Sequence, residues 1–175
     1  MQTFLPYSDF YKCVIVLDKK RAWKQVIETK QILCILRAEG LPDDWVESKS
    51  YTNQPFKNHP ACLMWVGYEE LLKHYYNVFL EYCKRVHRIN TDLRYLNCEL
   101  SGFCVINNEQ IYIDNTTTSL KLPFWYGNIN FHRSHRSRLI EKDKKFYNHK
   151  FEGDEGFNEG RYLWPVSETQ TYKLI

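Results

Sequence analysis

Residues 18–37 read DKKRAWKQVIETKQILCILR, which is the pattern of an amphipathic helix. Asp18 is a suitable N-cap and Gly40 a suitable stop, so we expect this helix over about residues 19–37. Positions three, four and seven residues apart share one helix face, which places Arg21, Lys24 and Glu28 together. The opposite, apolar side consists of Ala22, Val26, Thr29 and Leu33, broadened by Trp23 and Ile27.

Two further helices and a short N-terminal segment are expected around this one. A short segment that ends at Val16 has Ser8 as its candidate N-cap. A long helix is predicted over residues 59–85, because Asn58-His59-Pro60 is typical of a helix start and apolar residues then recur at near-helical spacing. This would be the central core helix. The last helix is predicted over about residues 134–146.

The remaining segments lack a steady helical period. Residues 41–57 are interpreted as a loop, and residues 103–113 predict a β-hairpin that turns at Asn107-Asn108-Glu109-Gln110. The tail, about 151–175, is rich in glycine and is expected to be mostly irregular. The sequence therefore predicts a mainly α fold: a single compact three-helix domain over 1–175, with a long central helix, a β-hairpin insertion at about 90–122 and an irregular tail.

Length and composition narrow the class of protein. A chain of 175 residues with 43% hydrophobic residues can form one folded domain. No apolar run approaches the ~18 residues that a membrane helix needs, and the first residues lack the pattern of an export signal. The six cysteines form no Cys-x-x-Cys pair and are interpreted as buried free thiols. We therefore expect an intracellular protein, in the cytoplasm or nucleoid or, if virus-encoded, in the host cell.

The net charge of +3 is small, but the basic residues are clustered. One cluster lies within residues 132–150, where Arg133, Arg136, Arg138 and Lys142 fall on the last predicted helix. Arginine and lysine supply most sequence-independent affinity for DNA because they neutralise phosphates. A solvated helix face is the alternative, although acidic residues would then be mixed in more evenly. We favour phosphate binding.

Glu28 and three histidines could carry chemistry. Glu28 lies near Arg21, Lys24 and Gln25, and a carboxylate among cations can serve as a base or an acid. By spacing alone, a solvated Lys24–Glu28 ion pair is the better interpretation. His132 and His135 can share a helix face, and a metal would need a third ligand such as His59 or Glu28. No recognised zinc spacing is present, so phosphate contacts or helix capping are favoured.

Three blocks of the sequence, in order and spacing, carry a resemblance to a known family. They are residues 17–33 with Glu28 in mid-helix, residues 59–85, and residues 137–142 followed by Phe146-Tyr147. Together they resemble the first, second and third helices of the endonuclease V family of pyrimidine-dimer DNA glycosylases. The start MQTFLPY, with NHPA, MWxG and SHRS, looks closer to a bacterial branch of that family. The resemblance covers most of residues 1–147, whereas 90–122 and the tail depart from it.

The resemblance implies a cofactor-independent glycosylase with abasic-site lyase activity on pyrimidine dimers or another modified base. In this family an N-terminal amine attacks C1′ of the damaged nucleotide and forms a Schiff base. Chain-terminal amines ordinarily have a pKa near ~8, against ~10.4 for lysine, so more of them are neutral and nucleophilic. Gln2 is too large for ordinary methionine removal, so the amine here would be that of Met1.

Glu28 matches the family's catalytic glutamate, and the partner would be damaged or modified double-stranded DNA, bound by a monomer. The predicted catalytic residues are thus Met1 and Glu28. The residues predicted to bind DNA are Arg21, Lys24, Gln25, His59, His132, Arg133, His135, Arg136, Arg138 and Lys142. Two alternatives stay open: a non-catalytic DNA-binding module, and a metal-dependent nuclease that uses His59, His132 and His135.

Overall fold

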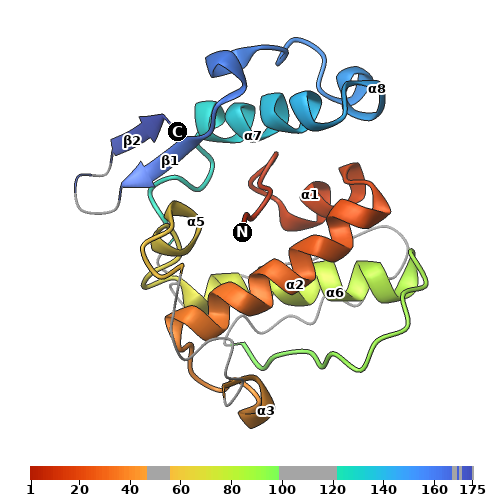
Figure 1. The fold of residues 1–175 in the computed structure, drawn as a ribbon, viewed down its shortest axis with the longest axis vertical. Helices are drawn as coiled ribbons and strands as arrows, with labels where there is room; N and C mark the ends of the chain where they lie inside the picture. The colour runs from red at the N-terminus through yellow and green to blue at the C-terminus, as the bar shows by residue number, and fades with distance from the viewer. Residues whose placement is uncertain (47–55, 99–121, 167–168, 170, 175) are drawn as a thin grey trace.

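The computed structural model describes residues 1–46, 56–98, 122–166, 169 and 171–174, and the described chain is mainly helical (Figure 1). The helices are α1 (Phe10–Val16), α2 (Lys19–Leu36), α3 (Asp43–Val46), α5 (Pro60–Leu63), α6 (Glu69–Arg85), α7 (Ile129–Lys142) and α8 (Lys144–Tyr147). Two 3-10 turns, Asn148–Lys150 and Phe157–Gly160, precede the antiparallel strands β1 (Leu163–Val166) and β2 (Thr171–Leu174). The predicted mainly α class is confirmed. Within the described segments, no helix is both long and apolar enough to span a membrane.

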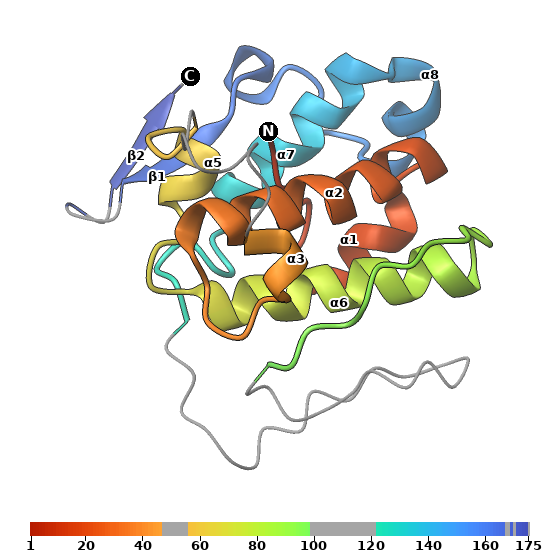
Figure 2. The ribbon, with the colours of Figure 1, turned by 60° about the horizontal axis from the view of Figure 1, so that its bottom comes forward.

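Helix α2 begins where the sequence predicts. The Asp18 side chain accepts a hydrogen bond from the backbone N–H of Arg21 (3.0 Å) and so caps the helix. The helix ends at Leu36, and Arg37 turns into the left-handed region with φ 54°. Gly40 also has a positive φ but lies three residues beyond this turn. The chain reverses here, which lets α6 pack along α2 (Figure 2).

The predicted helix over 59–85 is interrupted, which corrects the sequence interpretation. Pro60 begins the single turn α5, which His59 caps by accepting from the N–H of Ala61 (3.1 Å). Gly67 then takes φ +78°, which a right-handed helix cannot contain. The Glu69 carboxylate accepts from the N–H of Gly67, and α6 starts at Glu69.

Helix α7 begins earlier than predicted, at Ile129 rather than near Ser134. The Asn128 side chain caps it by accepting from two backbone N–H groups. Ser134 is buried in mid-helix, where its hydroxyl donates to the carbonyl of Phe131 and accepts from the N–H of Leu163. At the other end Asp143 stops α7 and caps α8. Ser134 therefore joins α7 to β1.

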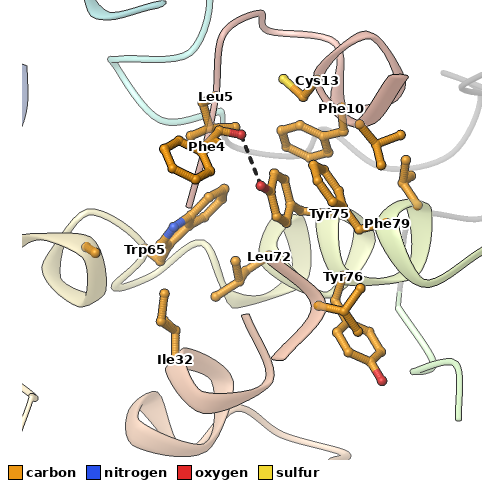
Figure 3. Close-up of a cluster of buried hydrophobic side chains, with 14 of the residues drawn as sticks. Phe4, Leu5, Phe10, Cys13, Ile32, Trp65, Leu72, Tyr75, Tyr76 and Phe79 are labelled. Carbon is orange, nitrogen blue, oxygen red and sulfur yellow. Dashed lines mark hydrogen bonds between the residues drawn. The ribbon is translucent and has the colours of Figure 1, made fainter. Parts of the chain in front are cut away.

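An aromatic core fills the space between α1, α2 and α6 (Figure 3). The rings of Phe10 and Tyr75 meet edge to face, and Tyr75 stacks on Phe79 with centroids 4.2 Å apart. Trp65 extends the cluster to Trp125, which precedes α7. The first residues of the chain run between α2 and α7 (Figure 1).

The tail is mostly irregular, as predicted, but it also carries one pair of short strands. β1 and β2 pair in the register Leu163↔Leu174. Asp154 anchors the tail to α7 by ion pairs with Arg133 (2.7 Å) and Arg136 (2.5 Å). The hairpin predicted at residues 103–113 lies outside the described residues. Free, buried thiols are confirmed for Cys13, Cys34, Cys62 and Cys83.

Candidate active site

Side chains from three helices hold the first residues of the chain in an extended path. The N–H of Gln2 donates to Glu28 Oε2 (3.1 Å), and the N–H of Phe4 donates to Gln25 Oε1 (2.7 Å). The Tyr75 hydroxyl donates to the carbonyl of Phe4 (3.0 Å). Thr3, Phe4 and Leu5 are buried. The path delivers the α-amine of Met1 to the face of α2 that carries Glu28.

The α-amine of Met1 lies 3.7 Å from Glu28 Oε1. Lys24 Nζ lies 3.5 Å from the same oxygen, so the ion pair expected from spacing is present alongside the amine contact. Glu28 is only 7% exposed, whereas the Lys24 side chain is 65% exposed. The carboxylate is therefore fixed by Gln2 on one oxygen and faces two amines on the other. A group so placed can exchange protons with an amine.

Lys24 and Lys142 lie near this carboxylate, and Arg21 and Arg138 lie near Lys142. Arg21 and Lys24 come from α2, and Arg138 and Lys142 come from α7, more than a hundred residues later. Partial burial lowers the pKa of Lys142, and the charges of Arg138, Arg21 and Lys24 lower it further, whereas Glu28 raises it. The cations thus repel one another in this state. An arriving anion would relieve that repulsion.

Arg21 is also engaged within the protein. Its guanidinium pairs with Asp18 (2.5 Å), donates to the carbonyl of Lys142 (3.2 Å) and lies 3.7 Å from Asp143. The Tyr147 hydroxyl donates to the same Asp18 carboxylate, and these partners together hold the pKa of Asp18 below its ordinary value despite its partial burial. This network fixes the start of α2 against the end of α7.

His59 borders the amine from the α5 side. Burial lowers the pKa of its ring, and the positive chain terminus lowers it further. The ring meets Trp164 of β1 edge to face, with centroids 6.0 Å apart. Beside it, the Cys62 thiol lies 3.4 Å from the sulfur of Met1. Burial raises the pKa of this thiol to about 11, so it stays protonated at neutral pH.

Two residues of this site were missed in the sequence, Cys62 and Tyr162. Tyr162 packs under the Arg138 guanidinium, which lies 6.0 Å from its ring centroid. The Tyr162 hydroxyl is buried, and this burial raises its pKa. Cys62 falls in an apolar pattern typical of a core residue, and Tyr162 belongs to the tail that departs from the family pattern. Neither residue lies in a local sequence pattern that would predict a functional site.

Several residues predicted to bind DNA are instead turned inward. Gln25 is fully buried, and its Oε1 accepts from Phe4 and Tyr75. His132 and His135 are buried against Leu5. Arg133 and Arg136 pair with Asp154.

The three histidines of the metal alternative also have other partners. The Nδ1 atom of each bonds a backbone group, in α5 for His59 and at Leu5 for the other two. In the part of the chain that the structure describes, no group of three or more His, Cys, Asp or Glu side chains could hold a metal ion. Among the described residues, these three histidines are therefore not part of such a ligand group.

The geometry defines a protein with an amine–carboxylate pair beneath a cationic face, which suits an enzyme that acts on a polyanion. Residues 1–95 match the model of the pyrimidine dimer DNA glycosylase family, and the chain belongs to this family. It is thus a DNA glycosylase of base-excision repair. The matched span contains Met1, Glu28 and His59, whereas α7 and the tail follow it. No curated protein and no solved structure matches the chain.

Proposed function

We propose that this DNA glycosylase also has abasic-site lyase activity. The α-amine of Met1 and the carboxylate of Glu28 would carry out both the removal of the base and the cutting of the strand. The proposal is supported above all by the 3.7 Å approach of the amine to a nearly buried carboxylate. Holding a nucleophile beside its proton acceptor removes much of the entropic cost of reaction. Pyrimidine dimers or another modified base would be the substrate, without a cofactor.

The chemistry follows from these two groups. The neutral amine attacks C1′, the C1′–N bond to the base breaks, and the base leaves with those electrons and takes up a proton. The amine loses its protons and the sugar ring opens, which yields the Schiff base. Removal of a C2′ proton then expels the 3′ phosphate and cuts the strand. Glu28, whose Oε1 lies 3.7 Å from the amine, can accept and return these protons.

DNA would lie against the cationic face. We propose that Arg21, Lys24, Arg138 and Lys142 contact phosphates, because the charges of the other three act on Lys142 and they come from both helices that border Glu28. His59 borders the same face, where an extruded nucleotide would have to enter. The buried Gln25, His132 and His135 would support the site from within, and Arg133 and Arg136 would hold the tail through Asp154. The active species would be a monomer.

Borohydride trapping on an abasic duplex tests the proposal. The intact protein should form a covalent adduct, and peptide mapping should locate it on Met1. Acetylation of the terminus, or one added N-terminal residue, should abolish the adduct. Lys24→Ala is the matched control, because Lys24 Nζ is the other amine beside Glu28 and lies 3.5 Å away. An adduct that survives terminal blocking but disappears in Lys24→Ala would overturn the role of Met1. No adduct, with DNA binding intact, would favour the non-catalytic module.

A further inference from the structure

Two histidines of α7 bond both peptide groups of a single residue, Leu5. His132 Nδ1 lies 2.8 Å from the carbonyl oxygen of Leu5, and His135 Nδ1 lies 3.3 Å from its N–H nitrogen. The two rings are three residues apart and so share one face of the helix. They reach back across 127 and 130 residues of sequence. We call Leu5 with these two rings the histidine clamp.

The partners fix the proton on each ring. A carbonyl can only accept, so His132 donates from Nδ1, while its Nε2 accepts from the N–H of Gly127 (3.2 Å). His135 must accept at Nδ1, because Leu5 N–H is a donor. Both rings are therefore neutral in the clamp. Burial lowers the pKa of each ring, and the charge of Arg136 lowers it further.

The histidine clamp is one of several contacts that fix the N-terminal segment. Immediately before it, Phe4 is bonded by Gln25 and Tyr75, and immediately after it the carbonyl of Pro6 accepts from Arg136 (2.7 Å). Chain termini are normally mobile unless they are tied down. Here these contacts fix the segment that follows the Met1 amine, which faces Glu28.

We propose that His132 and His135 are positioning residues, which keep the Met1 amine against Glu28 by holding Leu5. The inference rests on the proposed function, because it assigns the purpose of the clamp to that amine. The histidines touch neither substrate nor amine, and they act through the extended chain. Loss of the clamp should therefore slow Schiff-base formation more than it weakens DNA binding.

Substitutions can distinguish the effect of losing the bonds to Leu5 from the effect of losing the packing of the histidine rings. His132→Leu and His135→Leu remove the bonds to Leu5. His132→Asn and His135→Asn restore them, because an asparagine amide offers a donor and an acceptor near the Nδ1 position. His132→Gln and His135→Gln place the amide near the Nε2 position and miss Leu5. His149→Leu, a change at an exposed histidine, is the control.

Two measurements give independent answers. The first is the single-turnover rate of borohydride trapping at saturating protein on an abasic duplex, with the DNA dissociation constant at the same salt. The leucine and glutamine variants should trap ~10–100-fold more slowly, as expected for small misplacements of a reacting group. The asparagine variants should come within about threefold of wild type, and all dissociation constants should stay within about threefold. The second is the amide order parameters of Gln2 to Leu5 by NMR.

Those order parameters should fall in the leucine and glutamine variants and recover in the asparagine variants. Wild-type trapping rates in the leucine variants, or amides that stay rigid in them, would overturn the proposal. If a leucine variant does not fold, the glutamine and asparagine pair decides by the same criteria. If wild-type protein forms no adduct, the proposed lyase fails. The order parameters then decide whether the histidines hold the terminus.

Discussion

The backbone N–H of Gln2 donates to Oε2 of Glu28 at 3.1 Å, so the first peptide bond of the chain orients the carboxylate beneath the amine. The second oxygen, Oε1, is left to face the α-amine of Met1. A carboxylate that was free to rotate would offer either oxygen to Lys24, which is far more exposed. The Gln2 contact therefore leaves Oε1 as the oxygen that the Met1 amine shares with Lys24.

Glu28→Gln should separate binding from chemistry. The new amide oxygen can still accept from Gln2, so the fold should persist, but the group can no longer take up a proton at neutral pH. We expect strand cutting on an abasic duplex to slow by roughly 10²–10⁴-fold, the usual contribution of a positioned acid or base. DNA affinity should be retained, because a negative charge facing the phosphates is lost. Single-turnover gel assays check this, and a cutting rate within about threefold of wild type would contradict the role of Glu28.

Arg138→Ala and Lys142→Ala should weaken DNA binding in a salt-dependent way. Each lost phosphate contact lowers the slope of log K against log salt by ~0.9 in magnitude. Fluorescence anisotropy between low and moderate salt measures that slope. Lys173→Ala is the control, because Lys173 is exposed on β2 and lies outside the cationic face defined here. A slope that is unchanged in both variants would place DNA elsewhere on the protein.

Local spacing was enough to predict the helix face that carries the site. Asp18 caps α2 as expected, and Lys24 pairs with Glu28 at 3.5 Å, because both relationships lie within a few residues. Spacing could not show that Gln25 would be used by Phe4, or that His135 would face Leu5. These partners are set by how the N-terminal segment lies between α2 and α7. Gln25 and His135 were therefore assigned to DNA, although their described contacts are internal.

The break between α5 and α6 shows a second limit. The apolar residues on either side of Gly67 keep a near-helical period, because both segments face the same core. A single glycine within a helical pattern does not by itself end a helix. Its positive φ is required by the turn that seats Trp65 between Phe10 and Trp125. That requirement comes from tertiary packing, and it does not change the spacing of apolar residues in the sequence.

Gly160→Ala should destabilise the attachment of the tail to α7. Gly160 has φ +69°, and an added Cβ would lie 2.7 Å from Cγ of Glu141. The backbone conformation alone should cost about 1–2 kcal/mol. Gly67→Ala isolates that cost, since Gly67 has φ +78° with nothing within 4 Å of the added atom. Thermal unfolding should show a larger loss for Gly160→Ala, and Glu141→Ala should remove the excess. Equal losses in the two single variants would mean that Glu141 moves aside freely.

Folding stability should fall as the pH is lowered from about 6.5 to 5. The pKa of His135 is well below its ordinary 6.5 because the ring is buried beside His132 and Arg136, and the pKa of His132 is also lowered. Above pH 6.5 these rings are neutral in both states, and their contribution to stability is fully present. Below that pH these histidines are protonated in the unfolded chain but stay neutral in the folded protein. Stability therefore falls until the pH reaches the pKa of the histidines in the folded protein. Each such histidine contributes a slope of up to ~1.4 kcal/mol per pH unit.

His135→Asn supplies the control for this pH dependence, because it keeps an acceptor for Leu5 and removes the titrating ring. Its stability should fall less steeply between pH 6.5 and 5 than that of wild type, in urea unfolding at matched ionic strength. The lowered pKa of Asp18 acts in a separate range, near and below its ordinary 3.8, so it does not obscure the comparison. An identical slope in the two proteins would show that the His135 ring also takes up a proton within the folded protein in this pH range.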